Sequence, residues 1–266
     1  MIRDITLGQY FPGNGILHRL DPRVKVLMLI SVIVLIFCTF NFFALSVVVA
    51  LVAASVIMSK VPLKLYLKSM KAIIIVILIT SLLNLFYGTG EAIAQWWIFK
   101  ITQAGIRNAV FVAVRIISLV MVSSVLTFTT SPTDLTDALE RLMKPLGIFK
   151  VKTHEIAMMM TIALRFVPTL LEETDKIMSA QKARGADMES GNLIKRIKAL
   201  VPILIPLFVS AFRRAYDLAM AMECRCYQGG KGRTRMKQLR MHGRDFAAVA
   251  VVAAVLAGVI LCNIFL

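Results

Sequence analysis

Long apolar runs separated by short polar segments dominate the hydrophobic pattern of the chain. Five runs approach the ~20 residues that an α-helix needs to cross the hydrocarbon core of a membrane: residues 24–40, 42–58, 72–87, 109–128 and 247–266. A single residue, Asn41, separates the first two, which predicts a tight membrane hairpin. The pattern predicts an all-α fold, a polytopic membrane protein with about five transmembrane helices.

The long segment between the fourth and fifth runs, residues 129–245, is helical by pattern. It opens with Ser131 before Pro132, which predicts a capped short helix with proline in its first turn. Two longer helices are predicted at about 154–184 and 194–225, each apolar in its first half and polar in its second. Each is ~50 Å long at 1.5 Å per residue. We therefore expect both to start near the membrane and to project away from it.

Prolines and glycines refine these two long helices. Kinks are predicted at three internal prolines, Pro168, Pro202 and Pro206. Glycines are expected to end the helices, Gly185 and Gly191 for the first and Gly229 with Gly230 for the second. The apolar stretch 201–212 holds two of the prolines and is too short to cross a membrane. It is predicted to lie buried against other helices.

Composition agrees with a membrane protein that has one basic face. The 266 residues are 58% hydrophobic and carry a formal net charge of +16, and the mean hydropathy is +0.78. A soluble protein this apolar lacks the polar surface to carry so much charge. Nucleic-acid binding is the weaker interpretation, because the cations cluster beside apolar runs and form no patch interleaved with aromatic residues.

The distribution of cations predicts the orientation of the chain. They concentrate in the N-terminal segment, between the second and third runs, and before the last run, including Arg19, Arg23, Lys25, Lys60, Lys64, Lys68, Lys71, Lys231, Arg233, Arg235, Lys237, Arg240 and Arg244. The positive-inside rule then places the N-terminus in the cytoplasm and the C-terminus outside. The lysines at 60, 64 and 68 have helical spacing and are expected to meet anionic head groups of the bilayer.

This orientation divides the chain into three parts. Residues 1–128 form a membrane domain of four spans with a cytoplasmic N-terminal segment. Residues 129–245 form a cytoplasmic domain of one short and two long helices, and residues 246–266 form the last transmembrane helix.

Two arginines occupy matching positions, 41 residues apart, at the ends of the two long helices. Arg184 lies between Ala183 and Gly185, and Arg225 lies between Cys224 and Cys226. Small neighbours allow a partner to approach the helix backbone closely, and the protruding guanidinium has five donors to grip a carboxylate or helix-end carbonyls. The alternative is that each arginine is a cation that stabilises its own helix C-terminus. The coincidence of position, neighbours and helix length favours docking into a groove of another protein.

No constellation of residues predicts catalysis, a cofactor or a metal. The segment 228–234 holds Gly-Lys but lacks the upstream glycine of a phosphate-binding loop, and the histidines at 18, 154 and 242 are scattered. Glu172, Glu173 and Asp175 are expected to form salt bridges with Arg213, Arg214 or Lys176. The four cysteines form no disulfide framework. Cys224-x-Cys226 lacks a second ligand pair, so small close-packing side chains are favoured over a metal site.

One charge, Arg115, lies well inside a predicted span. Charge in hydrocarbon is expensive, so this arginine is a functional candidate. Pairing within the helix bundle and snorkelling are equally open interpretations.

The chain resembles the transmembrane T subunits of energy-coupling-factor (ECF) transporters, the EcfT/CbiQ family. The N-terminal GQYFPGNGILHRLDPRVK at 8–25, SPTDLTDAL at 131–139 and ALRFVPTL at 163–170 are similar to segments of that family. Ala183-Arg184-Gly185 matches its first Ala-Arg-Gly motif, and Cys224-Arg225-Cys226 stands where the second would be, without the alanine and glycine. The similarity covers nearly the whole chain.

The resemblance implies a function and partners. In this family the two long coupling helices cross, and their ends dock into two ABC-type ATPase subunits that hydrolyse ATP. A separate membrane-embedded S component binds a vitamin or metal ion, and the T subunit presents it a hydrophobic surface. The chain is then a non-enzymatic coupling subunit of a prokaryotic cell membrane. A self-contained secondary transporter and a membrane-anchored scaffold are the alternatives, although no inverted repeat or broken-helix pair supports the former.

Overall fold

The structure is a computed structural model of the chain. It describes residues 10–86, 92–96, 99–150, 152–186, 192–229, 239 and 241–265. These residues belong to two compact units. We call residues 10–138 together with 239–265 the bundle unit, and residues 139–229 the crossed-helix unit.

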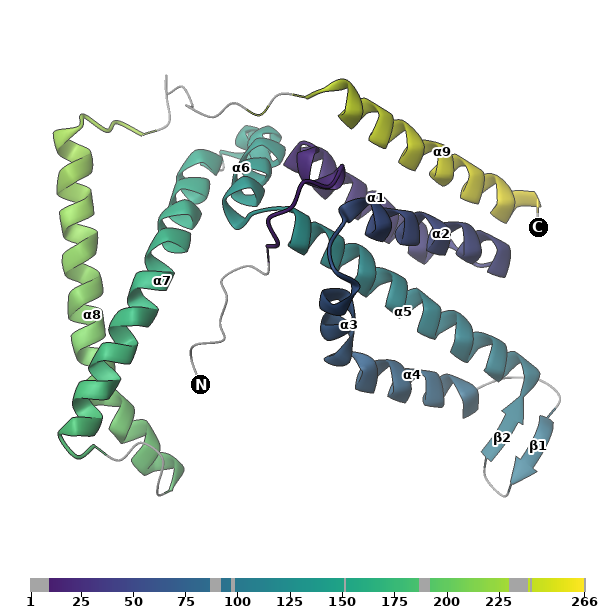
Figure 1. The fold of residues 1–266 in the computed structure, drawn as a ribbon, viewed down its shortest axis with the longest axis horizontal. Helices are drawn as coiled ribbons and strands as arrows, with labels where there is room; N and C mark the ends of the chain where they lie inside the picture. The colour runs from purple at the N-terminus through teal and green to yellow at the C-terminus, as the bar shows by residue number, and fades with distance from the viewer. Residues whose placement is uncertain are drawn as a thin grey trace. The chain divides into compact units, whose positions relative to one another are not determined.

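Apolar helices form the bundle unit: α1 (Pro22–Cys38), α2 (Phe42–Ser59), α3 (Leu63–Lys71), α4 (Ile74–Phe86), α5 (Gln103–Thr129) and α9 (Gly243–Phe265). Figure 1 shows α1, α2, α5 and α9 side by side. Their shared core consists of small and branched side chains, including Val32, Leu35, Ile36, Ala44, Val48, Val52, Val122 and Val259. Branched apolar residues interdigitate closely at such a core, and most of the remaining apolar side chains face outward, as expected in a bilayer.

The all-α membrane fold is confirmed, and α1, α2, α4, α5 and α9 correspond to the five predicted spans. By length and composition α2, α5, α7 and α9 are each sufficient to cross a membrane, and α3 with α4 forms a pair bent by 61° that together meets the same test. The three-residue connection between α1 and α2 confirms the predicted hairpin. The helix α7 passes this test although the sequence places it outside the membrane; of the four it is the least apolar.

A short antiparallel hairpin joins α4 to α5 and was not predicted. Strand β1 (Ala92–Trp96) pairs with β2 (Phe99–Thr102), with Trp96 opposite Phe99. Strands this short leave little periodic signal in a sequence. The side chain of Thr102 then accepts a hydrogen bond from the Gly105 amide at 3.1 Å, which caps α5.

The crossed-helix unit contains η2 (Lys144–Phe149), α7 (Thr153–Ala183) and α8 (Leu193–Cys224). It is entered through α6 (Pro132–Met143), whose first residues cluster with the bundle unit. The predicted cap of α6 is confirmed: the Ser131 hydroxyl accepts from the Asp134 amide at 3.1 Å and donates to the Asp134 carboxylate at 2.7 Å. The predicted helix stops Gly191 and Gly230, and the cations from 231 to 237 with Arg240, lie outside the described residues.

The sequence Asp21-Pro-Arg-Val-Lys25 ties α1 to the ends of two other helices. The Asp21 carboxylate caps α1 by accepting from the Arg23 amide at 2.9 Å, with Pro22 in the first turn. The buried Lys25 ammonium donates to the Thr129 carbonyl at 2.9 Å, at the end of α5. The Asp21 amide donates to the buried carboxylate of Asp245, in the first turn of α9, at 2.9 Å. These bonds fix the three helix ends against one another.

The N-terminal segment approaches the end of α2 so closely that Gly15 has no room for a side chain. A Cβ at this position would lie 2.5 Å from the Ser59 carbonyl oxygen. We expect Gly15→Ala to lower the free energy of unfolding by about 1–3 kcal/mol, the usual cost of overpacking. Thermal unfolding of the purified chain in detergent measures it. Gly258→Ala on α9 is the control, because an added Cβ there meets nothing within 4 Å. Equal melting of both variants would contradict the close approach.

Candidate functional site

The C-terminal ends of α7 and α8 have the same hydrogen-bonded cap. At α7 the Ala186 amide donates to the Gln181 carbonyl and the Gly185 amide to the Lys182 carbonyl, both at 3.0 Å. At α8 the Tyr227 amide donates to the Met222 carbonyl at 3.1 Å and the Cys226 amide to the Glu223 carbonyl at 2.8 Å. Both are Schellman motifs. Arg184 and Arg225 occupy the same position in them, directly after the last helical residue.

A Schellman motif requires a left-handed residue after the cap, and the two ends supply it differently. Gly185 has φ +86° and Cys226 has φ +55°. The prediction that Gly185 ends α7 is confirmed. The prediction that Gly229 and Gly230 end α8 is wrong, because α8 ends at Cys224 and Cys226 takes the left-handed conformation. A cysteine there has a Cβ that disfavours this conformation, so the second end is strained where the first is not.

All six predicted docking residues are exposed: Ala183, Arg184, Gly185, Cys224, Arg225 and Cys226. Neither guanidinium has a hydrogen bond or ion pair with any residue that the structure describes. The last-turn carbonyls of Gln181 and Met222 already accept backbone amides of the cap. Each helix end is therefore satisfied without its arginine, and both arginine side chains are available to a partner.

Helices α7 and α8 cross, and their arginine-bearing ends point in opposite directions (Figure 1). At the crossing the Arg214 guanidinium donates to the Glu173 carboxylate at 2.9 Å, which confirms the predicted salt bridge. Glu173 precedes Arg184 by eleven residues, and Arg214 precedes Arg225 by the same number. At 1.5 Å per residue the ion pair lies about 16 Å along the helix from each arginine. A pair of half-exposed groups adds little stability but fixes where two helices cross.

Residues 201–212 were predicted to lie buried against other helices, but within the crossed-helix unit the apolar half of α8 is exposed. Ile203 is buried at 3% exposure, whereas Phe212 is 72% exposed. Exposed apolar side chains follow one another at helical spacing. We call this set the α8 stripe: Ile197, Val201, Leu204, Phe208, Phe212 and Tyr216. Its length along the helix marks an interaction surface, because monomeric proteins rarely expose contiguous apolar patches of this kind.

Comparison with known proteins places the chain in a family. Residues 13–236 match the family model CbiQ, described as a cobalt transport protein. The chain is 52% identical to the energy-coupling factor transporter transmembrane protein EcfT of Clostridium kluyveri, with 93% of each chain covered. It is 48% identical to the EcfT of Ruminiclostridium cellulolyticum over 98% of each. It is 41% identical to that of Lactococcus lactis subsp. cremoris, over 98% of this chain and 97% of that one. The chain belongs to the EcfT/CbiQ family.

In this member of the EcfT/CbiQ family, Arg115 binds groups inside the bundle unit. The guanidinium donates to the Thr39 carbonyl, at the end of α1, at 2.7 Å. It also lies 4.8 Å above the Phe111 ring. Thr39 is fully buried, so its carbonyl needs such a donor. Of the two open interpretations, the structure supports pairing within the bundle.

The remaining sequence candidates form no catalytic or metal constellation in the part of the chain that the structure describes. Its described His, Cys, Asp and Glu side chains include no cluster that could hold a metal ion. The Nδ1 atom of His154 lies 3.1 Å from Glu140, and His18 contacts the Phe11 carbonyl through Nε2 at 3.0 Å. The described cysteines are free thiols.

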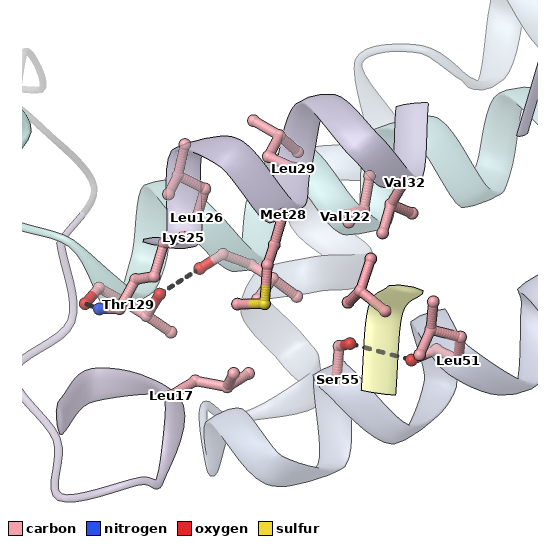
Figure 2. Close-up of a pocket in the computed structure, with 12 residues that line it drawn as sticks. Leu17, Lys25, Met28, Leu29, Val32, Leu51, Ser55, Val122, Leu126 and Thr129 are labelled. Carbon is pink, nitrogen blue, oxygen red and sulfur yellow. Dashed lines mark hydrogen bonds between the residues drawn. The ribbon is translucent and has the colours of Figure 1, made fainter. Parts of the chain in front are cut away.

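A cavity inside the bundle offers little to a solute. Figure 2 shows it between α1, α2, α5 and the segment around Leu17, lined mainly by apolar side chains. Its volume is about 70 Å³, whereas ligand pockets measure about 300–1,000 Å³. Its polar groups are already bonded: Ser55 donates to the Leu51 carbonyl at 2.9 Å and Thr129 to the Val125 carbonyl at 2.7 Å.

Sequence reasoning missed the polar junction of Lys25 and Asp245. Both side chains are buried, and they join helices that lie more than 100 residues apart in the sequence. A sequence signal existed, because each residue is the last charge before a long apolar run. Their partners are a backbone carbonyl and backbone amides, which no sequence pattern marks.

The strain at Cys226 predicts the effect of restoring glycine. We expect Cys226→Gly to stabilise the end of α8 by about 1 kcal/mol, because glycine adopts φ > 0 without a Cβ penalty. Hydrogen exchange of the last turn of α8 measures the change as slower exchange. Cys224→Gly is the control, since it weakens the final helical position by about 0.5–1 kcal/mol. Faster exchange in both variants would show that the cap depends on something other than this conformation.

Proposed function

We propose that this chain is the transmembrane coupling subunit of an ATP-driven, ECF-type importer of vitamins or other micronutrients. Two cytoplasmic ABC-type ATPase subunits dock at Arg184 and Arg225, and a membrane-embedded S component binds the substrate. Residues 129–245 form the cytoplasmic coupling domain, and the N-terminus lies in the cytoplasm of a prokaryotic cell. The chain itself is not an enzyme, because ATP is hydrolysed in the separate ATPase subunits.

One observation carries this proposal: two helix caps with the same hydrogen-bond pattern present two arginines, unpaired among the described residues, at opposite ends of the crossed helices α7 and α8. Two equivalent helix ends suit two equivalent binding grooves, and a pair of similar ATPase subunits provides one groove each. Family membership agrees, because the relatives are named as transmembrane proteins of energy-coupling factor transporters. A desolvated arginine at the centre of such a contact is worth about 2–4 kcal/mol.

The α8 stripe supports contact with the S component. An S component embedded in the bilayer has an apolar surface, and an apolar helix face placed near the membrane is complementary to it. The stripe lies within the first three-quarters of α8, while Arg225 follows the end of the helix. One continuous helix, α8, thereby carries both contacts, so that a movement imposed at Arg225 reaches the S component along α8.

A self-contained secondary transporter is the alternative, and the bundle gives it little support. The cavity of Figure 2 is too small for a vitamin and its polar groups are bonded within the chain. Arg115 holds a helix-end carbonyl instead of facing a solute path. Such a transporter requires a polar substrate site near the middle of the membrane.

Reversing the charge of the helix-end arginines tests the docking contact. We expect Arg184→Glu and Arg225→Glu each to reduce transport-coupled ATP hydrolysis by more than ~30-fold, the equivalent of about 2 kcal/mol. The assay is ATP hydrolysis and substrate uptake by the complex in vesicles. Arg213→Glu is the matched control, because Arg213 lies in the middle of α8 with the same charge. Wild-type coupled activity in the double variant would contradict docking.

Polar substitutions in the α8 stripe test the second contact separately. We expect Phe208→Asp with Phe212→Asp to prevent recovery of the S component while the ATPase subunits stay bound, because a carboxylate in an apolar interface remains without a partner. Affinity purification with quantitative mass spectrometry measures both partners. Ile148→Asp with Phe149→Asp provides the control at apolar positions outside α8 that are even more exposed. Retention of the S component at the wild-type level would exclude the stripe as its contact.

A further inference from the structure

Three cations from separate parts of the chain line one hollow in the bundle unit. Its lining consists of Asn14, Ile16, Arg19, Lys60 and Arg244, and its volume is about 540 Å³. Arg19 belongs to the N-terminal segment, Lys60 directly follows α2 and Arg244 lies in the first turn of α9. No carboxylate lines the hollow, so its three positive charges are complementary to an anion.

The three cations are free to bind a ligand. All are exposed, and none has an ion pair or side-chain hydrogen bond with the residues that the structure describes. Neighbouring cations at the same end of the bundle are engaged: the Arg23 guanidinium donates to the Leu239 carbonyl at 2.9 Å, and Lys25 donates to the Thr129 carbonyl at 2.9 Å. The cations that line the hollow are therefore those without a structural hydrogen bond to the described residues.

The backbone that carries each cation is fixed. Lys60 adopts φ +54°, and its amide donates to the Ile57 carbonyl at 3.2 Å. The close approach at Gly15 holds the N-terminal segment, with Arg19, against the end of α2. Arg244 precedes Asp245, whose carboxylate accepts from the amides of Asp21 and His242 at 2.9 and 2.7 Å. A preorganised set of donors binds an anion with little ordering cost.

The position of the hollow identifies the class of anion. It lies where α2 ends and where α1 and α9 begin, at one end of three membrane helices. Ile16, 51% exposed, adds an apolar side chain beside the three charges. Basic pockets at the ends of membrane helices bind anionic lipid head groups, and guanidinium groups bind phosphate oxygens in pairs. We propose that this hollow binds the phosphate of one anionic phospholipid head group.

Native mass spectrometry of the full-length chain tests the site. The chain is placed in nanodiscs of equal parts phosphatidylglycerol and phosphatidylcholine, released into detergent, and its retained lipid is counted. The pocket variant is Arg19→Gln, Lys60→Asn and Arg244→Gln, with asparagine chosen because it tolerates φ > 0. The control variant, Lys64→Gln, Lys68→Gln and Lys71→Gln, removes three charges from exposed positions of α3 outside the hollow, whose contact with head groups is diffuse and is lost on release into detergent. A third arm offers inorganic phosphate without phosphatidylglycerol.

We expect the wild-type chain to retain one phosphatidylglycerol in preference to phosphatidylcholine. Each pocket cation removed should lower this preference by about fivefold, while the α3 control keeps it. Equal loss in both variants would assign the preference to diffuse surface charge and overturn the proposal, as would the absence of preference in the wild type. Binding of inorganic phosphate in place of lipid would overturn the lipid assignment. If the triple variant does not fold, the single variant Lys60→Asn replaces it: a fivefold lower preference supports the site, and an unchanged preference overturns it.

Discussion

The C-terminal end of every helix leaves carbonyl groups without partners, and inside a membrane they must be satisfied without help from water. The bundle meets this constraint with two cations, of which Lys25 is buried and Arg115 is partly buried. Arg115 serves the end of α1, and Lys25 serves the end of α5. The ends of α7 and α8 meet it differently, because Schellman caps satisfy their carbonyls with backbone amides. This difference leaves Arg184 and Arg225 unoccupied, and an unoccupied, exposed arginine is what a docking contact with another protein requires.

The same constraint joins three helix ends of the bundle unit where the chain leaves it for α6. Residues 130 and 131 alone separate α5 from α6, and Lys25 fixes that end of α5 to α1. Asp245 fixes the beginning of α9 to the same place through the Asp21 amide. In the proposed importer, the chain enters the coupling domain from the most constrained end of the bundle.

Much of this arrangement follows from local sequence. Apolar run length predicted the spans, Ser131-Pro132 predicted the start of α6, and the repeated small-Arg-small pattern predicted two equivalent helix ends. Features that depend on distant partners were out of reach: the Lys25 and Asp245 junction and the cation-lined hollow. The left-handed conformation of Cys226 was also missed, because glycine and not cysteine is the residue expected there. The α8 stripe was predicted to be buried but is exposed within the crossed-helix unit. An apolar sequence indicates that a surface is covered, but it does not show whether the covering residues belong to the same chain.

The central claim is that Arg184 and Arg225 hold two ATPase subunits. The most direct measurement is affinity purification of the tagged chain from its native membrane, with mass spectrometry of the proteins recovered. We predict two ATPase subunits and one or more small hydrophobic proteins with the wild-type chain. The variant with both arginines changed to glutamate should lose the ATPases and remain in the membrane. Equal recovery of ATPases with both chains, or a wild-type chain that purifies alone and still moves a solute in vesicles, would contradict the account.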